Sequence, residues 1–326
     1  MDVVGFCSQT RLLIVAGKGG VGKTTVSAAL ARMAARAGLT TLIVEVEGKS
    51  GLSAVFGRRD PLTYDELVLA PGGGPDGAAD VRARTLTPDD ALLEYLEDHG
   101  MRRVSKRLSS SGALDVVATA VPGIKDILVL GKVKQLERAN TADLIILDAP
   151  AAGHAVTFLM SARGLLDAVT VGPIRAQAAD VIELLSDPTR CQVMLVTLPE
   201  ETPVNEVVET AFKLEDRVGV SLAPVVVNGM YPVIEGLDAD PAAAAASAGV
   251  HLSEGDVSAL RRAASFRRER EHLQAEQVAR LADGLPLPQI RLPFLFTTDL
   301  RLPEVDRLAD DMADGVAALP SAVAKS

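Results

Sequence analysis

A glycine-rich stretch near the N-terminus, RLLIVAGKGGVGKTT at residues 11–25, constrains the fold more than any other part of the chain. It begins with an apolar run and continues, after the glycines, into an alanine- and leucine-rich segment with helical character. Gly17, Gly22, Lys23 and Thr24 satisfy the pattern G-x-x-x-x-G-K-[ST]. In that pattern, backbone N–H groups and the N-terminus of the following helix surround phosphate oxygens. The stretch therefore predicts a buried strand, a phosphate-binding loop (P-loop) and a helix in direct succession.

The same loop contains the expected contacts to a nucleotide. Lys23 can reach the terminal phosphates, and the Thr24 hydroxyl can ligate Mg²⁺. The other predicted binding residues contribute mainly backbone N–H groups, and they are Gly19, Gly20, Val21, Gly22 and Thr25. The sequence thus predicts that the chain binds a nucleotide together with Mg²⁺.

Composition excludes several other classes of protein. A chain of 326 residues with 48% hydrophobic and 23% charged residues is typical of a globular protein with a large core. A net charge of −10, with 3% aromatic residues and no Trp, argues against a nucleic-acid-binding surface. The two cysteines, Cys7 and Cys191, lack C-x-x-C spacing, so we expect neither a disulfide nor zinc. With no evident signal peptide and no apolar run of about 20 residues, we expect a cytoplasmic protein that does not insert into membranes.

Strand-like and helix-like segments alternate along the rest of the chain. This alternation predicts an α/β fold with a mostly parallel sheet flanked by helices. We expect one P-loop domain over residues 1–326, with a helical subdomain inserted at about 87–140 between two strands. The strands expected after the P-loop lie at 39–46, 80–86, 142–147, 191–198, 222–228 and 287–292.

A carboxylate for the Mg²⁺ site is expected where a strand ends at the P-loop edge of the sheet. Asp148 follows the apolar run ADLIIL and fits this position. The alternative is an ordinary loop aspartate. Thr24 and Asp148 are therefore the two residues that we predict for the metal site.

The position of Lys18 makes the P-loop resemble a more specific motif than the general pattern. With Lys18, the loop reads GKGGVGKT, which resembles the deviant Walker A motif. That motif is shared by the arsenite-pump ATPase, the tail-anchored-protein targeting ATPase, the ParA and MinD ATPases and the nitrogenase iron protein. The resemblance implies that Lys18 reaches across a dimer interface to the partner's nucleotide. The alternative is a solvated lysine at a loop tip.

Two further segments resemble the switch regions of the arsenite and targeting ATPases. DAPAAGH, from Asp148 to His154, is similar to their switch II segment D-T-A-P-T-G-H, with Ala152 where Thr is usual. After the second strand, VEGKS stands where those ATPases have T-D-P-A-H, so Glu47 replaces the aspartate that positions water. The longer side chain of glutamate would displace the carboxylate that positions the water, so slow hydrolysis is our hypothesis. The alternative is that Glu47 is a surface acid without a role.

The likeness covers nearly the whole chain, from residue 12 to about 302. Asn228, at the end of VVVN, lies where the family contacts adenine, although an asparagine before glycine can also be a plain turn former. The segment 292–302 resembles the stretch that covers the base. The chain is most similar to the shorter ArsA-like ATPases of actinobacteria, the bacterial Get-like proteins, which also have V-E-V-E-G. This resemblance implies ATP or ADP as ligand and a homodimer, or a heterodimer with a paralogous ATPase.

Within that class, the sequence disfavours several branches. It lacks the cluster-ligating cysteines of the iron protein and the zinc-binding C-x-x-C of the targeting ATPase, and the segment 304–319 is acidic where MinD has a basic membrane helix. Two function classes remain. One is an ATP-hydrolysing dimer that acts on a partner or a membrane-protein client. The other is a weakly hydrolysing or non-hydrolysing subunit that completes a paralogue's site. The insert is the expected partner surface, unless its apolar residues pack on the sheet.

Overall fold

A nine-stranded sheet forms the centre of the protein in a computed structural model, which describes residues 1–46, 51–74, 77–98, 100–103 and 123–320. The strand order is β3-β4-β2-β5-β1-β6-β8-β9, with the short β7 paired to β6, and all pairings are parallel except β3 with β4. This confirms the predicted α/β fold. The strands are β1 (Leu12–Gly17), β2 (Thr41–Val46), β3 (Leu67–Ala70), β4 (Val81–Leu86), β5 (Leu144–Ala151), β6 (Cys191–Thr197), β7 (Ser221–Leu222), β8 (Val225–Met230) and β9 (Gln289–Pro293).

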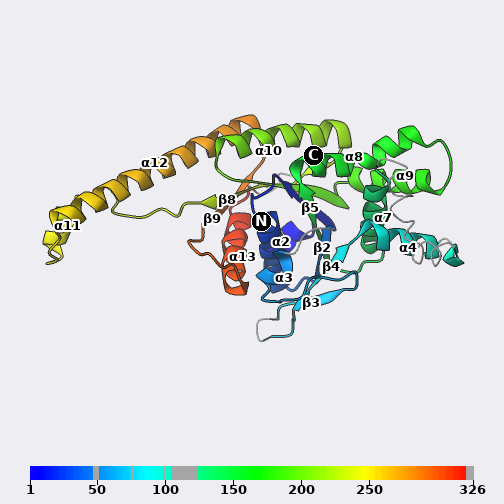
Figure 1. Ribbon diagram of the computed structural model, residues 1–326, viewed down its shortest axis with the longest axis horizontal. Coiled ribbons are helices and arrows are strands. Elements are labelled where there is room, and N and C mark those ends of the chain that lie inside the picture. The colour runs from blue at the N-terminus through cyan, green and yellow to red at the C-terminus, as the bar shows by residue number, and fades with distance from the viewer. Residues whose placement is uncertain (47–50, 75–76, 99, 104–122, 321–326) are drawn as a thin grey trace.

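Helices cover both faces of the sheet, because the buried strands are apolar on both sides (Figure 1). Alternate residues of one strand enter different cores: Leu13 and Val15 pack on one face, and Leu12 and Ile14 on the other. The first core includes α1 (Val3–Cys7), α2 (Lys23–Arg36), α3 (Gly51–Val55) and α13 (Leu302–Ala317). The second includes α4 (Pro88–Asp98), α7 (Ile124–Arg138), α8 (Ala152–Ala168), α9 (Pro173–Ser186), α10 (Glu201–Lys213) and the π-helical turn Leu214–Val218.

The acidic segment near the C-terminus has a structural explanation. In α13, Asp306 pairs with Arg32 of α2 at 2.7 Å and with Arg36 at 3.2 Å, and Asp310 pairs with Arg36 at 2.5 Å. The apolar face of α13 is buried against α2 and β9. These acids therefore help to fix α13 beside the helix that follows the P-loop.

The described part of the range 87–140 consists mainly of α4 and α7. Thr87 caps α4, since its hydroxyl accepts a hydrogen bond from the Asp90 N–H at 3.1 Å. Most apolar residues that we considered as a partner surface are buried in the main core, which confirms the packing alternative for them; these are Leu92, Leu96, Ile127, Leu128 and Leu130. The segment 104–122 lies outside the described residues, and the boundaries of an insert subdomain stay a prediction.

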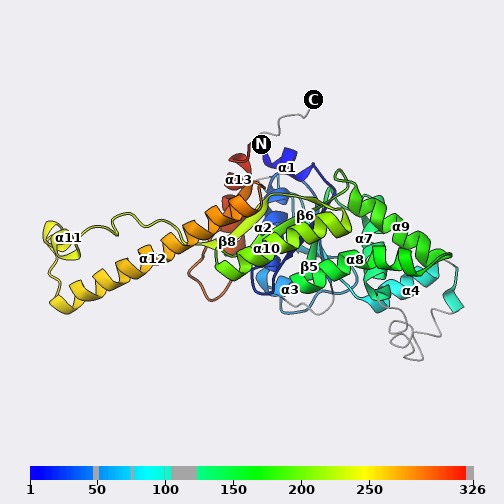
Figure 2. The ribbon, with the colours of Figure 1, turned by 90° about the horizontal axis from the view of Figure 1, so that it is seen from above.

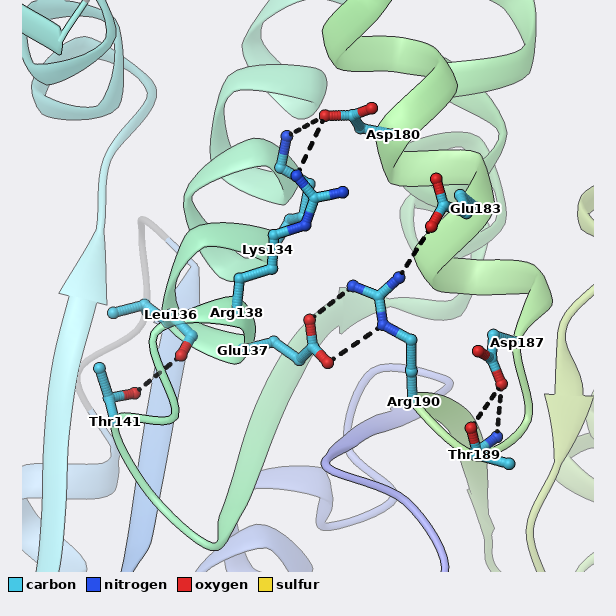
Figure 3. Close-up of polar contacts among 10 residues, drawn as sticks. All are labelled: Lys134, Leu136, Glu137, Arg138, Thr141, Asp180, Glu183, Asp187, Thr189 and Arg190. Atoms are coloured by element: carbon cyan, nitrogen blue, oxygen red, sulfur yellow. Dashed lines mark hydrogen bonds and ion pairs between the residues drawn. The ribbon is translucent and has the colours of Figure 1, made fainter.

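Ion pairs that each include a buried residue of α7 attach this helix to α9 and to the start of β6 (Figure 3). Arg190, just before β6, makes a two-point contact with the buried carboxylate of Glu137 at 2.6 and 3.1 Å. It also reaches the exposed Glu183 at 3.3 Å. Lys134 of α7, itself buried, pairs with Asp180 of α9 at 2.8 Å. The C-terminal half of α7 is thus fixed to its neighbours by charge as well as by apolar packing.

A projecting arm was not predicted from the sequence. The arm, residues 231–270, contains α11 (Pro241–Ser247) and the first half of α12 (Glu254–Gly284), and it extends away from the sheet (Figures 1 and 2). The buried residues of α12 all belong to its last third, and α11 buries none. Two exposed ion pairs link α12 to the chain before it: Arg261 with Asp240 and Arg268 with Asp238. Among the described residues, no helix combines the length and the apolar character that a membrane crossing needs.

Candidate nucleotide-binding site

The loop after β1 has the conformation that a phosphate cradle requires. Gly20 and Gly22 have φ of 86° and 91°, in the left-handed region that favours glycine. Gly22 is the N-cap of α2, and within the part of the chain that the structure describes no side chain caps this helix end. The first N–H groups of α2 are therefore available to an anion, and the helix dipole adds positive potential there.

Close packing around the loop excludes larger residues at two of the glycines. A Cβ atom on Gly17 would overlap the backbone oxygen of Val196 in β6, and one on Gly22 would overlap the amide of Asn228. The Asn228 side chain donates a hydrogen bond from Nδ2 to the backbone oxygen of Val21 at 2.9 Å. Asn228 thus stabilises the P-loop through a hydrogen bond to its backbone. Gly229, next in the chain, has φ of 77°, which is also consistent with the alternative that Asn228 is a turn former.

Lys23 lies at the start of α2 and is only 8% exposed. Its ammonium group donates to the backbone oxygen of Lys18 at 3.0 Å, so the loop folds back over its own lysine. A cation held at this position, beneath the N–H groups of the loop, can pair with the terminal phosphates of a nucleotide.

Thr24 and Asp148, the two residues predicted for the metal site, are in direct contact. The Thr24 hydroxyl donates to Asp148 Oδ2 at 2.7 Å, and Asp148 is fully buried. A hydroxyl and a carboxylate are oxygen donors of the kind that Mg²⁺ prefers, so these two residues fit the metal. The described residues contain no cluster of three His, Cys, Asp or Glu side chains that could hold a metal without help. A Mg²⁺ ion here would therefore need phosphate and water oxygens as further ligands.

Lys18 pairs within its own chain. Its ammonium group lies 2.6 Å from Glu206 Oε1 of α10, and the two side chains are 45% and 40% exposed. Lys18 and Glu206 line a cavity of about 670 Å³ between the loop, α8 and α10. Exposed ion pairs of this kind contribute about 0–1 kcal/mol, so little free energy holds Lys18 in place.

Several predicted site residues lie beyond what the structure describes. Glu47 belongs to the segment 47–50, which is outside the described residues. For Ala152 and His154 only the backbone is described, at the start of α8. The comparison with the family's switch segments therefore remains at the level of sequence.

An aromatic cluster stands out in the stretch expected to cover the base. Phe294 and Phe296, after β9, pack against each other at 4.8 Å between ring centroids, and each lies 5.6 Å from Tyr231. The Arg267 guanidinium of the arm lies over the Tyr231 ring at 4.3 Å. The Gln274 side chain of α12 accepts a hydrogen bond from the Tyr231 backbone N–H and donates one to the Gly229 backbone oxygen. The chain after Asn228 is thus bonded directly to the base of the arm.

One buried acidic residue beside Asp148 had not been predicted from the sequence. Glu45 is only 1% exposed, and in the sheet it is paired with Asp148 of β5. The signal was present in TLIVEV, where a charge interrupts an otherwise apolar buried strand. Glutamate is rarely buried this deeply unless it is paired.

Residues 10–170 match the sequence profile of a family described as anion-transporting ATPases. The ATPase BagA of Mycobacterium tuberculosis is 32% identical over 305 residues, which is 88% of this chain and 88% of BagA. An arsenical pump-driving ATPase of Escherichia coli is 28% identical over 252 residues, which is 71% of this chain and 41% of that protein. The ATPase get3 of Schizosaccharomyces japonicus is 30% identical over 153 residues, 46% of this chain and 44% of get3.

Proposed function

The chain belongs to the ArsA-type family of anion-transporting ATPases, and we propose that it binds Mg²⁺-ATP and acts as a dimer that couples nucleotide binding and hydrolysis to a partner protein. The observation that carries this proposal is the bond of 2.7 Å between Thr24 and Asp148, at the end of a loop whose geometry suits phosphate. Lys23, the loop N–H groups and the N-terminus of α2 bind the phosphates. Asn228 keeps the loop in place and contacts the adenine. Mg²⁺, when bound, neutralises charge on the β- and γ-phosphate oxygens.

The proposal assigns the remaining site residues as follows. Lys18 acts on the nucleotide of the partner chain, and leaving Glu206 costs little, since both side chains are partly exposed. Glu47 orients the attacking water. Proteins of this kind work in the cytoplasm, and a membrane-protein client is one candidate partner. Exchange of Glu47 for Gln is expected to abolish hydrolysis while binding persists; normal turnover in that variant would remove Glu47 from the mechanism.

Action of Lys18 in the partner's site has a sharp test in mixed variants. Lys18→Ala chains and Lys23→Ala chains should each be inactive alone. In their mixture, each heterodimer has one site with an intact loop and a Lys18 from the partner. With random pairing in a two-fold dimer, the mixture should recover about one quarter of wild-type ATPase activity.

The controls of this experiment separate the alternatives. A mixture of Lys18→Ala chains with Lys18→Ala,Lys23→Ala chains lacks any complete site and should stay inactive. If Lys18→Ala alone keeps wild-type activity, the lysine has no such role. If the first mixture recovers nothing although each variant dimerises, Lys18 acts within its own chain.

The second candidate is a subunit with weak turnover that completes the site of a paralogous ATPase. Glu47 in place of aspartate and Ala152 in place of threonine favour it. In that case the purified chain should bind Mg²⁺-ATP but hydrolyse it slowly. Activity should appear when the paralogue is added, and it should fall when the added chain carries Lys18→Ala. Full activity of the chain alone would exclude this candidate.

A further inference from the structure

Glu45 occupies a position that ordinarily holds an apolar residue. It lies within β2, where the preceding strand residues are fully buried and Glu45 itself is 1% exposed. A charged carboxylate at this depth costs several kcal/mol unless cations or hydrogen-bond donors compensate it. Its position in the sheet shows which groups it lies beside.

The sheet places Glu45 beside Asp148. The two are paired residues of β2 and β5, which are parallel neighbours, about 4.8 Å apart as strands in a sheet are. Paired residues of neighbouring strands point to the same face. Ile43 and Ile146, two residues earlier on the same strands, both pack in the core beneath α2. The two carboxylates therefore share the face on which α2 begins.

This face carries the phosphate-binding machinery. Asp148 accepts the hydrogen bond of Thr24, the second residue of α2, and Lys23 lies next to it in the chain. Two neighbouring buried carboxylates repel each other, and a cation between them relieves this repulsion. Mg²⁺ in nucleotide sites is commonly held by one or two carboxylates together with phosphate and water oxygens.

We propose that Glu45 is the second carboxylate of the metal site, which with Asp148 provides the negative charge that holds Mg²⁺ against the nucleotide. The proposal rests on the Mg²⁺-nucleotide function proposed above. It adds a residue on β2, one strand further from the P-loop than Asp148. It also explains why a buried acid lies two positions before Glu47, in the strand that leads into the segment expected to position water.

The test measures how much Mg²⁺ strengthens nucleotide binding. Affinities for ADP and ATP are determined by calorimetry with excess Mg²⁺ and with EDTA, for the wild type and for Glu45→Gln. The ratio of the two affinities should fall about tenfold or more in Glu45→Gln, as is typical when a group supporting a metal ligand is lost. Affinity in EDTA should stay equal or rise, since a negative charge near the phosphates is removed. Binding of Mn²⁺ in the presence of ADP, followed by electron paramagnetic resonance, should weaken in parallel.

Two further variants control for folding. Glu45→Asp keeps the charge and should retain most of the Mg²⁺ effect. Glu137→Gln changes another buried glutamate, remote from the P-loop, and should leave the ratio at the wild-type value. Melting curves without nucleotide show that each variant is folded.

The outcomes separate this proposal from the function on which it rests. If the wild type shows no Mg²⁺ enhancement, the proposed Mg²⁺-nucleotide site is wrong. If the wild type shows it and Glu45→Gln retains it in full, only the role of Glu45 is overturned. If Glu45→Gln weakens binding equally in Mg²⁺ and in EDTA, Glu45 serves as a counter-ion for a lysine and not for the metal.

Discussion

Replacing Lys23 with alanine is expected to weaken binding of ATP and ADP by about 100-fold or more. Each hydrogen bond from a charged group contributes about 1.5–3 kcal/mol, and 1.4 kcal/mol corresponds to a factor of ten. Lys23 is 8% exposed and donates to the Lys18 backbone oxygen, so its ammonium group is already in place before a nucleotide binds. Calorimetric titration with each nucleotide measures the loss.

A second lysine near the cavity provides the matched control. Lys213, at the end of α10, lines the same cavity as Lys18 but is partly exposed and pairs with Glu209 at 3.2 Å. Lys213→Ala removes the same charge from the same region and should change affinity less than threefold, as expected for a screened surface charge. Equal losses in both variants would mean that Lys23 acts only through general electrostatics. Unchanged affinity in Lys23→Ala would place the nucleotide elsewhere.

The parts of the site that sequence predicted are those in which neighbours in the chain are neighbours in space. The strand, loop and first turn of α2 form one local unit, and glycines with positive φ are a property of the loop itself. Asp148 required one step more. Since β5 is parallel to β1, its end had to reach the same edge of the sheet as the loop.

The parts that escaped prediction depend on contacts between segments that are far apart in the sequence. Asn228 contacts Val21 over 207 residues of sequence, and Lys18 contacts Glu206 over 188. Neither bond has a local signal. Glu45 was overlooked because a single acid in an apolar strand gains meaning only when the strand order places it next to Asp148.

The arm shows a different limit of sequence patterns. Its long helix has local signals in the sequence, which are alanine, charged residues and the Ser253 capping box. What the pattern could not give is that the outer half of α12 has almost no neighbours. A charged helix face is compatible both with solvent on the outside of a globular body and with a projecting helix.

The largest effect on stability is expected at the buried ion pair between Arg190 and Glu137. Arg190→Ala leaves the Glu137 carboxylate, 5% exposed, without its two-point partner. Breaking a buried pair in this way costs about 3–5 kcal/mol. The apparent melting temperature should fall by roughly 4–7 °C for a protein of this size. Calorimetric melting of the nucleotide-free protein measures both quantities.

Two companion variants isolate the buried charge as the cause. Glu183→Gln removes the exposed partner of the same arginine, and it should cost less than about 1 kcal/mol because Glu183 is 65% exposed. The double variant Glu137→Leu,Arg190→Met replaces both charges with apolar groups of similar size. It should recover most of the lost stability, since no charge is then left buried alone. If the double variant is as unstable as Arg190→Ala, the loss of stability comes from packing and not from the buried charge.

The shape of the melting curve also tests whether residues 87–140 form a separate subdomain. Glu137 belongs to α7, whereas Arg190 leads into β6 at the centre of the sheet. If α7 is part of the main cooperative unit, Arg190→Ala should lower a single transition, and amides of α7 and β6 should lose hydrogen-exchange protection together. If α4 and α7 form their own unit, the variant should show an early transition confined to them, while the P-loop strand stays protected and nucleotide affinity is kept. Because α7 contributes buried residues to the same core as β1, β5 and β6, we expect the single transition.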